Sequence, residues 1–378
     1  MRLNKNKNDC CGCGACFAAC PVHAINMIPD EEGFLYPSIN EKTCIDCGLC
    51  SRVCSFCDNY ARTDSQNGSQ YYALIHKDMG VRKSSRSGGA FYALSSAMLA
   101  NGGVVYGVAL NDNFEAKHIR IETLDSLSLL QGSKYVQSDK GNTFIDVKKD
   151  LEDGKKVFFS GTGCEISGLL SYLQNMRVDL NGLYTCDIVC HSVPSPLIWK
   201  ENVSDIKKRL GGSIDELSFR DKCFGWNAHI ESYRHGKKTV YSNCYTTLFY
   251  RHLSLRPSCA NCHFCNYERS GDFTIADFWG SEKLELSMDR INGISLLMVH
   301  TDKGRALMRE AEFDICTVEV KKEQTEQPNL VRPSKLPPER ESFWSSYKKL
   351  GYKPTTSRFY PLINRIQLVY NRLLRRNK

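Results

Sequence analysis

The sequence predicts a multidomain protein that combines α+β and α/β structure. A small cysteine-rich module comes first, and a larger region of mixed α/β structure follows. The spacing C-x2-C-x2-C-x3-C occurs twice, at residues 10–20 and 44–54. From Tyr71 onward, short apolar segments alternate with amphipathic ones, as strands and helices do in α/β folds. A polar segment without periodicity separates the two regions, and we place a linker at 61–70.

Length and cysteine content narrow the class of protein. The 378 residues allow two or three domains, and 19 of them are cysteines. The N-terminus lacks the charged and apolar stretches of a secretory signal, so we expect a cytoplasmic protein with reduced thiols. Those thiols are then metal ligands rather than disulfides. The uncharged run 91–110 is interrupted at Asn101, Gly102 and Gly103, which predicts a helix followed by a strand rather than a membrane span.

The repeated motif predicts two iron–sulfur clusters. Three cysteines at this spacing wrap one four-iron cube, and the fourth points to the other cube, so Cys54 completes the first site and Cys20 the second. The predicted ligands are Cys10, Cys13, Cys16, Cys20, Cys44, Cys47, Cys50 and Cys54. Zinc is the alternative. Residues 1–60 resemble bacterial two-cluster ferredoxins, and Cys11, Cys57 and His23 are expected to be non-ligands.

The rest of this module is small. Residues 25–28 and 34–39 are predicted strands, joined by a turn. So little apolar core remains that bound clusters would have to hold the module together.

The larger region divides into elements by its periodicity and its glycines. The predicted strands are 71–76, 104–110, 156–164 and 183–190, and the predicted helices are 90–99, 143–154 and 166–175. We divide this region at residue 150, into 71–150 and 151–330. In such sheets the loops at the carboxyl ends of strands carry the site.

A second cysteine group falls at such strand ends. Cys164 and Cys190 each close a strand, and the segment 259–265 adds a cysteine triplet. Together they predict a third cubane site, with zinc or unrelated buried cysteines as alternatives. The cysteines without ligand spacing are expected to be small core residues: Cys186, Cys223, Cys244 and Cys316.

Several motifs together resemble one family, the beta subunits of coenzyme F420 hydrogenases and dehydrogenases. They occur in order over roughly residues 1–330: SGGAFYAL, GSKYVQS, FFSGTGCEISGL, DIVCHSVPSP, FRDKCFGW and CANCHFCNYERSGDFTIADFWG. Members are iron–sulfur flavoproteins that pass electrons between clusters, FAD and a hydride acceptor or donor, in some cases a deazaflavin coenzyme. Gly163, Glu165 and Ser192 depart from the family pattern beside the third site.

The resemblance implies particular site residues. It assigns the third cluster to Cys164, Cys190, Cys259 and Cys262, and leaves Cys265 as a spare. For FAD the candidates are Ser87, Gly88, Gly89, Ser133, Lys134 and Tyr135. Glycines at a helix start leave N–H groups free for an anion, although a simple loop and helix cap explain residues 87–89 equally well.

The resulting prediction is an iron–sulfur flavin-dependent oxidoreductase with its own substrate pocket. The alternatives are an electron-carrier subunit without a small-molecule substrate and a zinc-dependent binding module.

Lys134, Arg220 and Lys222 are candidates for stabilising a reduced flavin or an anionic substrate, with surface salt bridges as the alternative. His191 is a candidate proton donor, and a structural hydrogen bond explains it equally well. Expected partners are a redox protein or low-potential electron donor and a small-molecule hydride acceptor or donor.

The segment 331–378 forms a basic tail. It has twelve Lys/Arg and two Asp/Glu, a charge of +10, so the preceding 330 residues carry −2 of the total +8. Within it, Leu362, Ile366, Val369 and Leu373 recur at helical spacing. We expect this helix to pack on its own domain, with an anionic membrane or an acidic partner protein as alternatives. No nucleic-acid-binding motif accompanies the charge.

Overall fold

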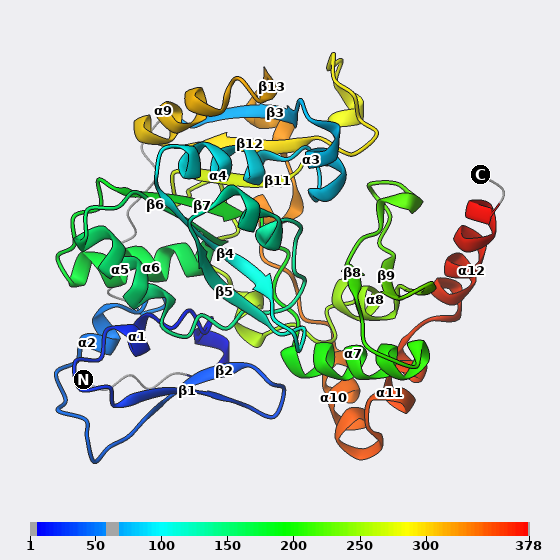
Figure 1. The fold of residues 1–378 in the computed structure, drawn as a ribbon. Coiled ribbons are helices and arrows are strands. Elements are labelled where there is room, and N and C mark those ends of the chain that lie inside the picture. Colours follow the sequence, from blue (N-terminus) through cyan, green and yellow to red (C-terminus); the bar gives the residue numbers. More distant parts are fainter. Residues whose placement is uncertain (1–5, 58–67, 377–378) are drawn as a thin grey trace.

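The computed structural model describes residues 6–57 and 68–376. A mixed α/β body carries a small ferredoxin-like module on one side and a helical region on another (Figure 1). The predicted fold class is therefore confirmed. Most of the predicted linker 61–70 lies outside the described residues, and the first strand of the body begins at Gln70.

The module is built on a short hairpin. Strands β1 (Ile25–Pro29) and β2 (Leu35–Ile39) pair antiparallel, as predicted. Each cysteine motif contains a one-turn helix, α1 (Ala15–Ala18) or α2 (Leu49–Arg52), and a 3-10 turn, η1 (Lys7–Asp9), precedes the first motif. The residue before each of these helices is a left-handed glycine, Gly14 (φ 83°) and Gly48 (φ 69°), so both motifs enter their helix in the same conformation.

The body is organised around an eight-stranded mixed sheet in the order β13-β3-β12-β11-β7-β6-β4-β5. The central pairs β4/β6, β6/β7 and β7/β11 are parallel, and the outer pairs are antiparallel. The bounds are β3 (Gln70–His76), β4 (Val104–Leu110), β5 (Ala116–Ile121), β6 (Val157–Thr162), β7 (Leu183–Ile188), β11 (Phe273–Asp277), β12 (Ser295–Val299) and β13 (Ile315–Glu319). The four predicted strands correspond to β3, β4, β6 and β7.

Helices cover both faces of this sheet. Helices α4 (Ala90–Ala100) and α9 (Asp302–Ala311) pack on one face with the 3-10 segment η2 (Leu124–Leu130). Helices α5 (Thr143–Glu152) and α6 (Gly163–Asn175) pack on the other, and the module rests on α6 (Figure 1). The three predicted helices are confirmed as α4, α5 and α6, with α6 beginning three residues earlier than expected. The run 91–110 divides into α4 and β4, and no helix in the described ranges has the length and apolarity to cross a bilayer.

A third region packs beside the sheet. A small antiparallel sheet, β10-β9-β8, shares a core with helices α7, α8, α10 and α11. The bounds are α7 (Pro196–Leu210), β8 (Glu216–Ser218), β9 (Glu231–His235), β10 (Lys238–Ser242), α8 (Cys244–Tyr250), α10 (Glu339–Leu350), α11 (Tyr352–Phe359) and α12 (Leu362–Arg376). The shorter elements are α3 (Met79–Ser84), η3 (Lys222–Phe224), η4 (Pro257–Asn261), η5 (Ser281–Lys283), η6 (Lys322–Thr325) and η7 (Pro328–Leu330).

The tail does not behave as expected. Its last segment is helical, as predicted, but the four apolar residues expected to pack on the domain, Leu362, Ile366, Val369 and Leu373, are exposed. The expected core role also fails for Cys223 and Cys316, which are exposed, whereas Cys186 is fully buried in the sheet core.

Candidate functional site

The N-terminal cysteines line two separate hollows. Four motif cysteines, Cys10, Cys13, Cys16 and Cys54, line one hollow together with Cys11. Four motif cysteines, Cys20, Cys44, Cys47 and Cys50, line the other. The fourth cysteine of each motif therefore lies at the hollow of the other motif, because the chain crosses over through β1 and β2.

The chemistry of these hollows suits a cluster better than a single ion. Within residues 6–57 and 68–376, no group of three or more His, Cys, Asp or Glu side chains is arranged to hold one metal ion. Four thiols spread around a hollow instead match a four-iron cube, in which each iron takes one thiolate. The other lining residues are mainly small or apolar, which is the surrounding such clusters occupy. The donor set therefore fits a [4Fe-4S] cluster in each hollow.

The third cysteine group assembles from three loops of the body. Cys164 stands at the start of α6, Cys190 follows β7, and Cys259 and Cys262 lie on or next to η4. Burial raises the pKa of Cys190, and the nearby thiols of the other three raise it further. Four partly buried thiols thus lie near one another, although they come from positions up to 98 residues apart. The Cys265 thiol hydrogen bonds with Cys262, so this spare cysteine lies beside the group rather than away from it.

Cys11 links the first and third groups. It lies outside the motif spacing, but its thiol is within hydrogen-bond reach of both Cys13 and Cys164. The hydrogen bond from Cys11 is the main reason that the pKa of Cys13 falls to about 7. Helix α6 comes so close that a Cβ on Gly168 would lie 2.7 Å from the Cys13 sulfur. No local pattern in the sequence marks these two cysteine groups as neighbours.

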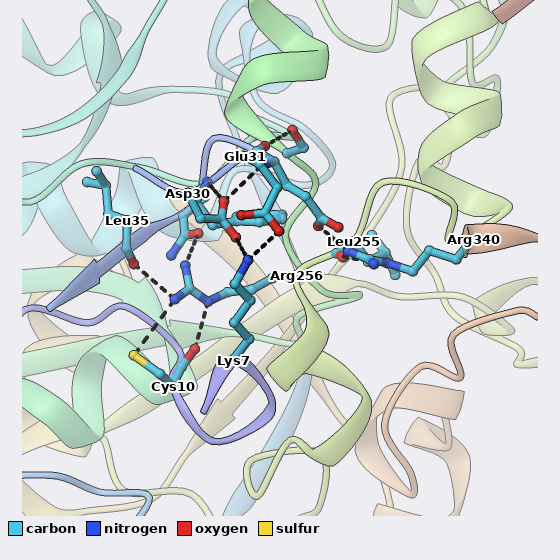
Figure 2. Close-up of polar contacts among 12 residues, drawn as sticks. Lys7, Cys10, Asp30, Glu31, Leu35, Leu255, Arg256 and Arg340 are labelled. Carbon is cyan, nitrogen blue, oxygen red and sulfur yellow. Dashed lines mark hydrogen bonds and ion pairs between the residues drawn. The ribbon is translucent and has the colours of Figure 1, made fainter. Parts of the chain in front are cut away.

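Arg256 is the main polar contact between the module and the body. Its side chain is fully buried and donates to the Cys10 carbonyl (2.8 Å), the Leu35 carbonyl (3.0 Å) and the Gln137 amide oxygen (2.8 Å). Figure 2 shows the guanidinium directed at Cys10, whose sulfur is 3.8 Å from Nη2. It also lies 4.1 Å from the centre of the Tyr36 ring. Burial raises the pKa of Cys10, and the positive charge of Arg256 opposes this rise.

A second arginine holds the tip of the hairpin. Arg340, on α10, pairs with Glu32 and donates to the Leu255 carbonyl at 2.8 Å (Figure 2). On the same turn, Lys7 contacts Asp30 and Glu31, both at 2.7 Å. The module is thus fixed to the segment 255–256, immediately before Cys259.

Glu165, one of the departures from the family pattern, forms a buried ion pair. Its carboxylate accepts a hydrogen bond from Lys140 at 2.8 Å and caps α6 through the Thr162 N–H at 2.9 Å. Burial alone would raise the pKa of Glu165, but the charges of Lys140 and His118 hold it at about 2. A charged pair therefore lies directly beside Cys164.

A basic cavity of about 340 Å³ opens between α3, the 131–135 loop and the small sheet. Its lining includes six cations, Lys83, Arg86, Lys134, Arg220, Lys222 and Arg234, and two acids, Glu216 and Asp221. Burial lowers the pKa of Lys134 to about 7, and burial with the charge of Arg86 lowers the pKa of Lys222 to about 7. An anionic ligand close to either ammonium would raise its pKa again.

Only half of the predicted flavin-binding residues line the cavity. Ser133, Lys134 and Tyr135 line it, whereas Ser87, Gly88 and Gly89 do not. Those three pack against the sheet: Ser87 hydrogen bonds with Ser295 at 3.0 Å, and a Cβ on Gly88 would lie 2.0 Å from the Leu74 carbonyl. The glycines are thus required for close packing against the sheet, and the assignment of these three residues to a flavin stays a prediction.

Aromatic side chains connect the third cysteine group to the cavity. His191 follows Cys190, and its ring centre is 5.4 Å from that of Phe249. Phe249 is 5.6 Å from Tyr135, which lines the cavity. His191 also hydrogen bonds with Asn329 (2.9 Å) and His252 (3.0 Å), which agrees with the structural alternative for this residue. Arg220 donates to Tyr135 (3.2 Å) and pairs with Asp277 (2.7 Å).

Comparison with known proteins identifies both parts of the chain. Residues 9–56 match the 4Fe-4S dicluster domain, and residues 154–324 match the C terminus of the coenzyme F420 hydrogenase/dehydrogenase beta subunit. A curated relative, a subunit of the F(420)H(2) dehydrogenase of Methanosarcina mazei, is 23% identical over 215 residues. The match covers 53% of this chain and 60% of the length of that relative.

A solved structure shows a weaker likeness. It is a chain of the xenon-derivatised F420-reducing [NiFe] hydrogenase complex from Methanosarcina barkeri, with 15% identity and a TM-score of 0.49. The alignment covers 76% of this chain and 90% of that chain.

Replacing Arg256 should separate the module from the body. Arg256→Met leaves three buried acceptors without donors, and we expect the protein to lose at least about 3 kcal/mol of unfolding free energy. Urea titration of the anaerobically purified protein, followed by tryptophan fluorescence and visible absorbance, measures this loss. The matched control is Arg177→Met, since Arg177 is exposed. Equal urea midpoints for the two variants would contradict this role of Arg256.

Removing one partner of the buried ion pair should be costly. Glu165→Gln keeps the helix cap but leaves the Lys140 charge uncompensated, and we expect a loss of roughly 3–5 kcal/mol, of which Lys140→Met in the same chain restores a part. Since the pKa of Glu165 falls from 4.5 to about 2 on folding, its stabilising effect is present above pH 4.5 and is lost as the pH falls towards 2. Urea unfolding at pH 7 and pH 3 checks both statements. A single variant as stable as the wild type at pH 7 would refute them.

Proposed function

From the matches of residues 9–56 to the 4Fe-4S dicluster domain and of residues 154–324 to the C terminus of the coenzyme F420 hydrogenase/dehydrogenase beta subunit, we propose that this chain is an iron–sulfur flavin oxidoreductase. In this proposal it relays electrons between three [4Fe-4S] clusters and FAD, and on to a hydride-accepting or hydride-donating substrate such as a deazaflavin coenzyme. The observation that carries the proposal is the basic cavity and its aromatic connection to the third cysteine group.

The cysteines divide into three ligand sets in this proposal. The first set is Cys10, Cys13, Cys16 and Cys54, the second is Cys20, Cys44, Cys47 and Cys50, and the third is Cys164, Cys190, Cys259 and Cys262. Bound clusters would supply one-electron transfer, and a bound flavin would convert between single electrons and hydride. The protein fixes the positions of the three sets relative to one another. The first and third sets are in contact through Cys11, and Cys47 of the second set is exposed. We therefore place the exchange with a redox partner protein at the second set.

The cavity residues bind and orient in this proposal. Lys83, Arg86 and Arg234 offer cationic donors to phosphate groups, and Lys134 offers a partly buried ammonium. Arg220, fixed by Asp277 and Tyr135, places a permanent positive charge where negative charge would gather on a reduced ligand. Tyr135 and Phe219 supply apolar surface for a ring system.

The second candidate is an electron-carrier subunit without a small-molecule substrate. The exposure of Cys47 in the second set favours it, because a surface site exchanges electrons with another protein. A carrier without a small-molecule substrate does not require a cavity lined by six cations. The flavin content of the purified protein therefore distinguishes the two candidates.

The crossed arrangement of ligands predicts the outcome of single cysteine substitutions. Cys54→Ala should remove the electron paramagnetic resonance signal of the first cluster, and Cys20→Ala that of the second. Each should lower the iron and sulfide content by one cluster of the three. The control is Cys316→Ala, since Cys316 is exposed and lacks ligand spacing. Loss of the same cluster in both variants would overturn the crossed arrangement.

Flavin binding should depend on the cavity cations. We expect denaturation of anaerobically purified protein to release FAD, and Lys83→Met to weaken FAD binding about tenfold, as the loss of one charge-assisted contact of ~1.4 kcal/mol. Lys83 is exposed and lines the cavity, so this change spares the core; the exposed Lys200, outside the lining, provides the control Lys200→Met. If no flavin is recovered even after reconstitution, the electron-carrier alternative replaces the proposal.

A further inference from the structure

Helix α12 turns its apolar side away from the protein. Six large apolar residues on it are at least half exposed: Leu362, Ile363, Ile366, Val369, Tyr370 and Leu373. With 3.6 residues per turn, these positions form one continuous stripe along the helix. A helix that served only to complete its own domain would bury such a stripe.

The side of α12 that meets the protein is largely polar. The partly buried positions are Asn364, Leu368 and Asn371, which lie opposite the stripe. The Asn364 carbonyl accepts from Asn243 at 3.1 Å, and Arg365 donates to the Ser357 carbonyl at 2.9 Å. The helix lies against η3, at the outer edge of the molecule (Figure 1). These contacts anchor its first turn and fix the orientation of the stripe.

The charged residues of the C-terminal segment 361–378 are all basic. From residue 361 to 378 the sequence has five Lys/Arg and no Asp/Glu. Helical spacing puts positions 365, 372 and 376 next to the apolar stripe. A cationic row beside an apolar stripe complements a surface that is negative outside and apolar beneath. At fifteen residues, α12 is too short and too polar to cross a bilayer, so it would lie in the plane of the surface.

We propose that α12 docks this protein peripherally on an anionic lipid surface. The stripe enters the boundary between headgroups and acyl chains, with Tyr370 at the level of the headgroups, and the positive charge of the segment is attracted to the lipid phosphates. A lipid surface fits better than an acidic protein groove, because the stripe is long and continuous and the cations are not paired with acids within the helix. The inference is independent of the redox function proposed above.

Vesicle binding of the full-length, cluster-loaded protein tests this docking. We expect at least tenfold stronger co-sedimentation with vesicles of equal amounts of phosphatidylcholine and phosphatidylglycerol than with phosphatidylcholine alone. Salt at about 1 M, where the Debye length is about 3 Å, should remove most of this preference. Ile366→Glu combined with Val369→Glu should reduce binding at least tenfold.

A matched control makes the test specific to α12. Ile291 is 76% exposed on a loop outside α12, so Ile291→Glu makes the same change elsewhere and should leave vesicle binding unaltered. Visible absorbance shows whether each variant keeps its clusters. The proposal is overturned if the wild type binds neither vesicle type, if the α12 variant binds as well as the wild type, or if both variants lose binding equally. Dimerisation lost in the α12 variant, without vesicle binding by the wild type, would assign the stripe to a second copy.

Discussion

The buried guanidinium of Arg256 is the contact on which the arrangement of the cysteine groups depends. Removing an arginine from water is costly, and the cost is offset only when its donors are satisfied. Here two backbone carbonyls of the module, Gln137 of the body and the Tyr36 ring surround it. Arg256 lies three residues before Cys259, so the same side chain that holds the first cysteine set also positions the loop of the third.

Close packing then brings these two sets together. Gly168 lets α6 approach Cys13, and Cys11 fills the space between Cys13 and Cys164. The buried pair of Glu165 and Lys140 adds fixed charges beside the same contact. Because electrostatic interactions are stronger inside a protein than in water, these charges and hydrogen bonds would influence the reduction potential of a cluster bound here.

Local sequence patterns predict the helices and strands well, but they do not predict contacts between residues that are far apart in the sequence. Alternation and glycine stops located β3, β4, β6 and α4–α6, because these signals are written in neighbouring residues. The cysteine spacing likewise predicted the two crossed hollows of the module. The sequence predicts Cys11 to be a non-ligand and gives no sign of its contact with Cys164, because the two residues are 153 positions apart. Gly88 and Gly89 pack closely against the sheet, which the sequence does not indicate, and their role in anion binding stays a prediction. The tail helix was predicted, and its orientation, set by Asn243 and Asn364, was not.

The crossing of the chain within the module has a consequence for biosynthesis. Each hollow takes a cysteine from both ends of the segment 10–54, so neither can be completed on the ribosome until the second motif has emerged. Arg256, which donates to the Cys10 carbonyl at the first hollow, lies 246 residues downstream of Cys10, and such distant contacts form late in folding. Insertion of iron and sulfide should therefore follow release of most of the chain, and a truncated translation product would keep its thiols open to oxidation.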